Sequence, residues 1–320
     1  MKKRLLTLIL MLAAIVGSVG AQTQISSAAE FRSYVTDGST GNFKLTADIN
    51  LGTWTPRTFK GVFDGNGHTI TIKVSGADNL GLFSVLSGAT VTNLTVKGTV
   101  TAEYYNAGGI AGKMDTKSVI KNCKSYVDVT LKASNGENGG GIVGSCYEGS
   151  TIEKCRAYGT ITTHTGLYHT AGGIAGQIQK GSGEACTMKD CYFGGIVAGP
   201  TNYVGMITGK KDSESTIKNC TYSSQNANGF KAIGTPQGSQ DDSANGVVAT
   251  NVEPTNDENN ESSDTDTPEA IDTWSRLYVA ISRNKTAIQL TANVKYGEGE
   301  GAHAKKALPA IAADKEVTIY

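Results

Sequence analysis

Residues 107–112 read AGGIAG, and closely similar phrases occur as NLGLFS at 79–84, GGGIVG at 139–144, AGGIAG at 171–176 and YVGMIT at 203–208. A second phrase follows each copy in turn: VTNLTVKGTV, IKNCKSYVDV, IEKCRAYGTI, MKDCYFGGIV and IKNCTYSSQN. Two independent phrases that keep step through five copies indicate an internal repeat of about 32 residues. Such a period is typical of proteins built by stacking one structural unit on the next.

Each phrase has an anchor residue that marks its place in the repeat. The glycine anchors are 28, 32, 32 and 32 residues apart: Gly81, Gly109, Gly141, Gly173 and Gly205. The anchors of the second phrase are 29, 32, 36 and 29 residues apart: Leu94, Cys123, Cys155, Cys191 and Cys220. If the units stack in register, the second set forms a buried ladder of leucine and free thiols.

The second phrase alternates in polarity. Apolar or small residues fall at every second position from Cys155 through Ala157 and Gly159 to Ile161. A period of two predicts a strand with one buried face, and we expect the glycine phrase to be a second short buried strand. Stacked copies of such a unit form an all-β fold, a parallel β-helix or solenoid, and the preference of parallel crossovers makes it right-handed. A β-propeller would need about four antiparallel strands per unit.

The N-terminus has the features of a signal peptide over residues 1–21. Lys2, Lys3 and Arg4 precede an apolar run at 5–16, and small residues lead to a cleavage point after Ala21. No other stretch reaches the length needed to span a bilayer. We therefore expect a protein that is secreted or held at the outer cell surface, with the periplasm as the alternative, and with no membrane span after cleavage.

A short helix is expected to cap the first coil. Ser27 is the candidate N-cap, and Ala28, Phe31 and Val35 follow at helical spacing. A cap is needed because the first coil of a solenoid otherwise exposes its core and its strand edge.

The remainder of the chain divides by composition. Residues 22–250 form the predicted β-helix, and residues 251–272 carry eight acids and no Lys or Arg, which predicts a disordered acidic linker. Residues 273–320 repeat the opening, because IQLTANV at 288–294 echoes FKLTADI at 43–49. We interpret them as the start of a second, incomplete β-helix-like module; a compact C-terminal module is the alternative.

Composition excludes some partners. Lys+Arg and Asp+Glu are 29 each, so no net electrostatic field favours nucleic acid. We also expect a monomer.

The phrase at 139–144 formally matches a dinucleotide motif but is one copy of the repeat. Asp64 to Gly67 (DGNG) is interpreted as a turn, not a calcium loop. No cofactor or metal is expected. Cys146 and Cys186 lie outside the ladder and are the better candidates for a bridge.

The opening coil FKGVFDGNGHTITI at 59–72, followed by glycine phrases alternating with I-x-N-C phrases, resembles the GLUG-repeat proteins. The resemblance covers about residues 25–235, and the fifth copy departs from it because GMIT replaces G-I-x-G. It implies an exported bacterial surface protein with an adhesive or binding role. GLUG repeats also occur beside the catalytic domain of some IgA-specific metallopeptidases, but this sequence has no H-E-x-x-H motif and only four histidines.

Outward tyrosines are the candidate binding residues. Tyr126 and Tyr158 share a repeat position and should stack on one outer face. Tyr104 and Tyr168 precede their glycine phrases by matching offsets, with Tyr105 and His169 beside them. Aromatic faces suit sugar rings and peptide partners, although a ladder that only shields the sheet is an equal alternative.

The sequence thus predicts a non-catalytic binding or adhesion protein that recognises a host or cell-wall glycan or a surface protein, with no catalytic residue to name. One alternative is a polysaccharide lyase or hydrolase of the pectin-lyase-like fold. Its acids would need to cluster, but they are scattered, at Glu103, Asp128, Glu148, Glu153 and Asp190. The other alternative is a structural stalk for a missing C-terminal module.

Overall fold

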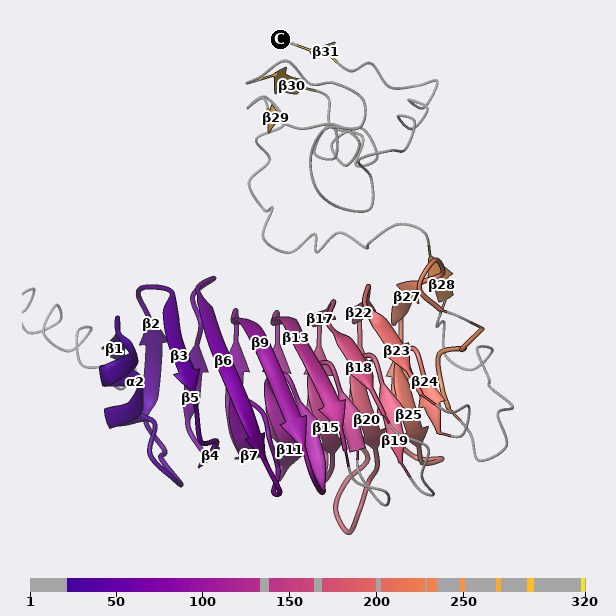
Figure 1. Ribbon diagram of the computed structural model, residues 1–320, viewed down its shortest axis with the longest axis horizontal. Helices are drawn as coiled ribbons and strands as arrows, with labels where there is room; N and C mark the ends of the chain where they lie inside the picture. The colour runs from indigo at the N-terminus through magenta and orange to yellow at the C-terminus, as the bar shows by residue number, and fades with distance from the viewer. Residues whose placement is uncertain are drawn as a thin grey trace, which may run out of the picture. The chain divides into compact units, whose positions relative to one another are not determined.

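The computed structural model describes residues 22–132, 138–163, 169–199, 203–227, 229–234 and 248–250, and three short strands at 269–271, 287–290 and 318–319. The all-β prediction is confirmed. Parallel strands stack as a β-solenoid of about six turns, and the described residues include one short helix. In Figure 1 the coils succeed one another from β1 at the left to β28 at the right.

Equivalent strands of successive coils pair in parallel to form four sheets. Sheet A contains β1 (Thr23–Ile25), β2 (Asn42–Leu45), β5 (Val62–Asp64), β8 (Thr90–Thr92), β12 (Val119–Lys121), β16 (Thr151–Glu153), β21 (Thr187–Lys189) and β26 (Thr216–Lys218). Sheet B contains β4 (Arg57–Phe59), β7 (Phe83–Ser87), β11 (Ala111–Asp115), β15 (Val143–Cys146), β20 (Ala175–Ile178) and β25 (Thr208–Lys211).

Sheet C is the largest of the four. It contains β3 (Ile49–Thr53), β6 (Thr69–Gly76), β9 (Thr95–Ala102), β13 (Lys124–Leu131), β17 (Arg156–Ala157), β18 (Thr160–Thr162), β22 (Tyr192–Phe193), β23 (Ile196–Ala198), β27 (Thr221–Ser223) and β28 (Val248–Thr250). Sheet D contains β10 (Asn106–Gly108), β14 (Asn138–Gly140), β19 (Thr170–Gly172) and β24 (Val204–Gly205). A complete coil therefore runs from sheet A to C, then D, then B.

Both repeated phrases are corners between two strands, and the prediction that the glycine phrase is a single strand was wrong. In the second phrase, the residue before each anchor has a positive φ of 53–56° and turns the chain from sheet A to sheet C: Asn93, Asn122, Lys154, Asp190 and Asn219. Asparagine and aspartate tolerate this left-handed conformation better than most residues. This preference explains why asparagine often stands directly before the anchor residue of the second phrase.

The glycine phrase turns the chain from sheet D to sheet B. In the middle coils the corner lies at Gly109, Gly141 and Gly173, where the added Cβ would lie 2.1–2.3 Å from an atom of the opposite wall or the next coil. The two outer anchors were assigned wrongly. Gly205 pairs with Gly172, and Met206 takes the place of Gly173 in the last coil, because the spacing there is 33 residues.

Gly81 is likewise displaced by one register position from the stacked corner glycines Gly109, Gly141 and Gly173. The bridge between Leu80 and Ala107 aligns Gly81 with Gly108, because the first coil lacks one residue at this corner. The corrected alignment also changes the fifth copy of the motif. It reads MITG from Met206 to Gly209, so the final glycine is retained and the first one is replaced.

The second-phrase anchors form a continuous interior file. The strands on either side of each anchor pair in register, and Leu94, Cys123, Cys155, Cys191 and Cys220 are all buried, at 0–1% exposure. All six cysteines have free thiols. The ladder thiols donate to backbone carbonyls, as Cys155 Sγ does to the carbonyl oxygen of Glu153 at 3.3 Å. Burial raises the pKa of Cys155, Cys191 and Cys220 well above the usual thiol value.

Helix α2 (Ala28–Tyr34) caps the N-terminal coil as predicted. Ser27 is its N-cap, with the side-chain oxygen accepting from the backbone N–H of Glu30. The helix buries Phe31 completely, with ring centroids 5.4 Å from Trp54 and 5.7 Å from Phe63. This aromatic packing closes the apolar interior at its first coil.

The chain divides into two compact units, at Met1–Pro254 and Thr255–Tyr320. The second contains β29 (Glu269–Ile271), β30 (Ala287–Leu290) and β31 (Thr318–Ile319), which pair in parallel. Strand β29 falls within the stretch predicted as the linker, and its pairing partner is more than a dozen residues downstream. The boundary at 272 stays a prediction. The predicted leader at 1–21 and residues 251–268 of the predicted linker lie outside the described residues.

Candidate binding surface

The outer face of sheet C carries a stack of tyrosines. Along β13 the side chains alternate between exposed and buried, so Tyr126 points outward and is 43% exposed while Val127 is buried. Tyr126 stacks on Tyr158 of the next coil with ring centroids 4.7 Å apart and planes 11° apart. These two residues therefore occupy the same position in successive coils, as the repeat predicts. We call Tyr126, Tyr158 and the adjoining Tyr192 the aromatic patch.

Tyr192 was missed by the sequence analysis. It pairs with Arg156 in the register of sheet C, and its ring meets that of Tyr158 edge-on at 6.1 Å. Gly194 makes this contact possible, because a Cβ there would lie 2.9 Å from Tyr192 and 3.0 Å from Tyr158. Tyr192 itself is only 7% exposed, so it supports Tyr158 from the side and offers little surface to a ligand. The pattern that could have found it is the aromatic residue directly after Cys191.

Cations surround the aromatic patch. Lys97 is exposed in the preceding coil, and its Nζ lies 5.7 Å from the ring centroid of Tyr126. The guanidinium of Arg156 lies 6.0 Å from the Tyr192 ring, and Lys124, paired with Arg156, is exposed. Such cation–π contacts hold the rings in place, and the exposed Lys97 and Lys124 leave two ammonium groups at the surface. The nearby Asp128 carboxylate accepts a hydrogen bond from the backbone N–H of Thr160 at 2.8 Å.

Hydroxyl groups are frequent elsewhere on this face. Outward positions of sheet C are occupied by threonines in register with one another along successive coils: Thr69 with Thr95, Thr101 with Thr130, and Thr130 with Thr162. A flat face with stacked rings, cations and hydroxyls can make stacking contacts and hydrogen bonds over several coils at once.

The other predicted binding residues do not join the aromatic patch. Tyr104 and Tyr105 lie between β9 and β10 and are 57% and 61% exposed. Tyr104 is seven residues beyond Lys97 along the chain, which is roughly 20 Å at the rise of a strand. Tyr168 lies outside the described residues. His169 is only 2% exposed, so it offers almost no surface to a ligand and does not suit the binding role predicted for it.

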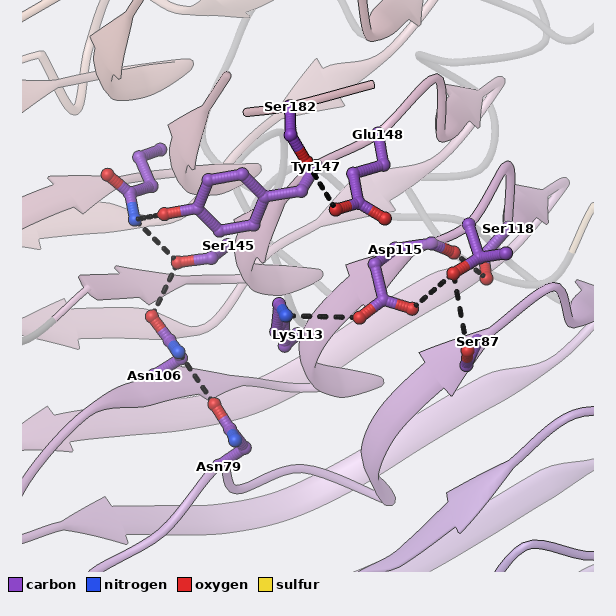
Figure 2. Close-up of polar contacts among 12 residues, drawn as sticks. Asn79, Ser87, Asn106, Lys113, Asp115, Ser118, Ser145, Tyr147, Glu148 and Ser182 are labelled. Carbon is purple, nitrogen blue, oxygen red and sulfur yellow. Dashed lines mark hydrogen bonds and ion pairs between the residues drawn. The ribbon is translucent and has the colours of Figure 1, made fainter. Parts of the chain in front are cut away.

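A second polar cluster lies where sheet D meets sheet B. Figure 2 shows the hydrogen bonds that run from Asn79 through Asn106 to Ser145. Gln177 continues the chain, its Nε2 donating to Ser145 Oγ at 3.0 Å and to the Tyr147 hydroxyl at 2.5 Å. Ser145 is fully buried and Gln177 is 8% exposed, so their polar groups are satisfied within the protein.

Three titratable side chains of sheet B and its following turn lie together beside this cluster. Lys113 Nζ lies 3.0 Å from the Asp115 carboxylate and 5.5 Å from the centroid of the Tyr147 ring (Figure 2). Burial raises the pKa of Tyr147, which outweighs the opposing influence of Lys113 and keeps the phenol protonated at neutral pH. A protonated phenol cannot abstract a proton, so the arrangement is suited to holding a corner of the solenoid together.

The part of the chain that the structure describes has neither a metal-binding cluster nor a membrane-spanning helix. Within those residues, no group of three or more His, Cys, Asp or Glu side chains is arranged to hold a metal ion. No helix among them is long and apolar enough to cross a bilayer. The predicted turn at Asp64 is present, because Asn66 and Gly67 have φ values of 50° and 81° and the Asp64 carboxylate accepts from the Asn66 N–H at 2.9 Å.

No family model matches the chain, and no curated protein matches it. Among solved structures, it is similar to a protein from Bacteroides ovatus described as a "putative immunoglobulin A1 protease", with 24% sequence identity, a TM-score of 0.46, and coverage of 65% of this chain and 77% of that chain. The strand pairing of the described residues defines the chain as a parallel β-solenoid protein, and a likeness this distant transfers neither activity nor site.

Proposed function

We propose that this chain is an exported, GLUG-type repeat protein without catalytic activity, which binds an acidic glycan along the outer face of sheet C. The observation that carries the proposal is the stacked pair Tyr126 and Tyr158, kept partly exposed on a flat face. Large rigid rings that remain in water are costly to expose and are enriched where a protein contacts a ligand.

The charge around the rings supports an acidic ligand. Lys97 and Lys124 are exposed beside the aromatic patch, whereas Arg156 is 5% exposed and supports the Tyr192 ring from within. Sugar rings can stack on the tyrosine faces while carboxylate or sulfate groups meet the lysines, and threonine hydroxyls suit the sugar hydroxyls. Repetition along the solenoid favours a polymer, since successive sugar units can meet successive coils.

The test is a binding screen of the purified chain against uronic, sulfated and neutral polysaccharides. We expect Tyr126→Ala/Tyr158→Ala to weaken binding to acidic polymers by about tenfold or more, corresponding to at least ~1.4 kcal/mol. Lys97→Gln should weaken binding less and reduce its dependence on salt.

Tyr104→Ala/Tyr105→Ala is the matched control, because it also removes two exposed tyrosines but leaves sheet C intact. Unchanged binding by the sheet C variant, with loss in the control variant, would move the site to the loop between β9 and β10. Binding to a host matrix protein in place of any polysaccharide would show that the partner is a protein. Thermal unfolding of each variant checks that the fold is retained.

A further inference from the structure

Cys146 and Cys186 lie next to each other outside the cysteine ladder. Cys146 ends β15, and Cys186 directly precedes β21 in the following coil. Both are buried, at 0% and 1% exposure. Cys146 Sγ lies 3.8 Å from the carbonyl oxygen of Ser150, and the two thiols are close enough to alter each other's ionisation. This contact joins consecutive coils at the turn from sheet B to sheet A.

That turn differs in length between the two coils. Four residues, 147–150, lead from Cys146 to β16, whereas eight residues, 179–186, lead from Ile178 to β21. Ile178 pairs with Cys146, and Thr187 pairs with Thr151, so Cys186 occupies the place that Ser150 has in the coil before. A longer turn loses more conformational entropy when it is ordered. A covalent link from its last residue to the preceding coil would offset that loss.

The ladder cysteines are unsuited to such a link. Side chains in register on parallel strands keep their Cβ atoms about 4.8 Å apart, beyond the roughly 3.5–4.5 Å that a disulfide requires. Cys146 precedes the turn of one coil, whereas Cys186 ends the turn of the next coil, so the two do not share a register position. The spacing between paired strands therefore does not fix the distance between their Cβ atoms. Of the six cysteines, this pair combines mutual contact with freedom from the ladder.

The environment of the pair also separates the two sulfurs chemically. The interaction between the two thiols lowers the pKa of Cys186 and raises that of Cys146. The thiolate is the nucleophile in disulfide exchange, so we take Cys186 as the sulfur that attacks the oxidant when local opening of its turn exposes it.

We propose that Cys146 and Cys186 form a disulfide in the mature protein, which in the cell requires the export inferred from the leader, since disulfides persist in oxidising compartments. The oxidant is an external disulfide, either a small molecule or a thiol–disulfide oxidoreductase. The Cys186 thiolate attacks one of its sulfurs and releases the first thiol. The Cys146 thiolate then attacks Cys186 Sγ and releases the second thiol. Two cysteine thiols become one disulfide, and the two protons pass to the two thiols of the reduced oxidant.

The experiment uses the full chain incubated with oxidised glutathione, denatured, alkylated and measured by intact mass. We expect two of the six cysteines to be protected, which leaves four alkylated, and a non-reducing digest to contain a peptide pair that links Cys146 with Cys186. Alkylation of all six cysteines, or a bridge between ladder cysteines, would overturn the proposal.

A stability measurement gives an independent readout. The oxidised protein should unfold roughly 5–15 °C above the reduced protein, and this difference should disappear in Cys186→Ser. Cys220→Ser, which alters the ladder and leaves the pair intact, should keep the difference. Equal unfolding temperatures for oxidised and reduced wild-type protein would count against a stabilising bridge. These outcomes are independent of polysaccharide binding, so the two proposals can fail separately.

Discussion

At Asn122 a single backbone angle decides where one sheet ends and another begins. Its φ of 55° turns the chain between β12 and β13, and its N–H donates to the carbonyl oxygen of Glu153 in the next coil at 3.1 Å. Most residues lose about 1–2 kcal/mol in this conformation, whereas glycine adopts it freely and asparagine more readily than most. Asparagine therefore favours the corner, although Lys154 adopts nearly the same angle in the next coil, where packing must supply the difference.

We predict that Asn122→Ala lowers the free energy of unfolding by about 1 kcal/mol, or roughly 2–4 °C in unfolding temperature, because alanine resists a positive φ. Asn122→Gly is the matched control and should remain within about 0.5 kcal/mol of the wild type. Urea unfolding followed by circular dichroism measures both. Equal losses in the two variants would mean that the side-chain amide, and not the backbone angle, stabilises the corner.

Glu153 is held between two lysines of neighbouring coils on the outer face of sheet A. Its carboxylate oxygens lie 3.3 Å from Lys121 Nζ and 3.4 Å from Lys189 Nζ, and its side chain is 15% exposed. Burial raises the pKa of Glu153, but the hydrogen bonds from the two lysines outweigh it and leave the pKa below its usual value. A lowered carboxyl pKa stabilises the folded state above the unfolded pKa and ceases to do so as the pH falls through the folded pKa.

Glu153→Gln should therefore destabilise the protein by about 1 kcal/mol at pH 7, and the difference from wild type should shrink below a pH of about 4.5 as the wild-type carboxylate becomes protonated. Urea midpoints at pH 7 and pH 3 measure the effect. Glu184→Gln removes a more exposed pair with Lys117, with both side chains at least 65% exposed, and should change the midpoint at neither pH. A constant difference between Glu153→Gln and wild type at both values would contradict the ion-pair explanation.

At the scale of the element, helix α2 is short, and its contribution is the burial of one ring. We predict that Phe31→Ala lowers the free energy of unfolding by about 3–5 kcal/mol, because it leaves a cavity between Trp54 and Phe63. Tyr34→Ala, at the exposed end of the same helix, should have a much smaller effect because Tyr34 is 42% exposed. Thermal unfolding compares the two variants. Similar losses would indicate that helix propensity, and not the aromatic contact, is what matters.

The elements show what the sequence could and could not predict. The alternation that begins at Cys155 predicted the buried face of sheet C. In that coil the face is divided between β17 and β18, whereas in the preceding coil it runs unbroken through β13. The three-residue strands of sheet A and sheet D were missed, since three residues contain too little alternation to recognise. The corners were missed as well, although the asparagines before the cysteines carried their pattern. The right-handed sense of the coil stays a prediction.

The candidate surface was predictable in part for the same reason. Tyr126 and Tyr158 lie inside regular strands, where repeat position fixes which way a side chain points. Tyr192 joined them through Gly194, and a contact that depends on a missing side chain leaves little trace in a repeat pattern. His169 lies just before β19, outside the strand, where an offset counted from the glycine phrase does not fix orientation.

At the scale of the first compact unit, each coil contacts mainly the coils beside it, so stability should spread from neighbour to neighbour. We predict that Phe31→Ala removes amide-exchange protection strongly in β2 to β5 and weakly or not at all in β16 to β26. Hydrogen exchange read by mass spectrometry at peptide resolution tests this. Uniform loss of protection along the unit would show that it unfolds as one cooperative block.

The interior ladder of Cys123, Cys155, Cys191 and Cys220 has a practical consequence. Each thiol belongs to a different coil, and none is reachable from water while that coil is closed. The rate at which each one reacts with an alkylating reagent therefore reports how often its own coil opens. The four thiols can therefore serve as reporters at successive positions along the solenoid. The order in which they are labelled would show the order in which the coils open during unfolding.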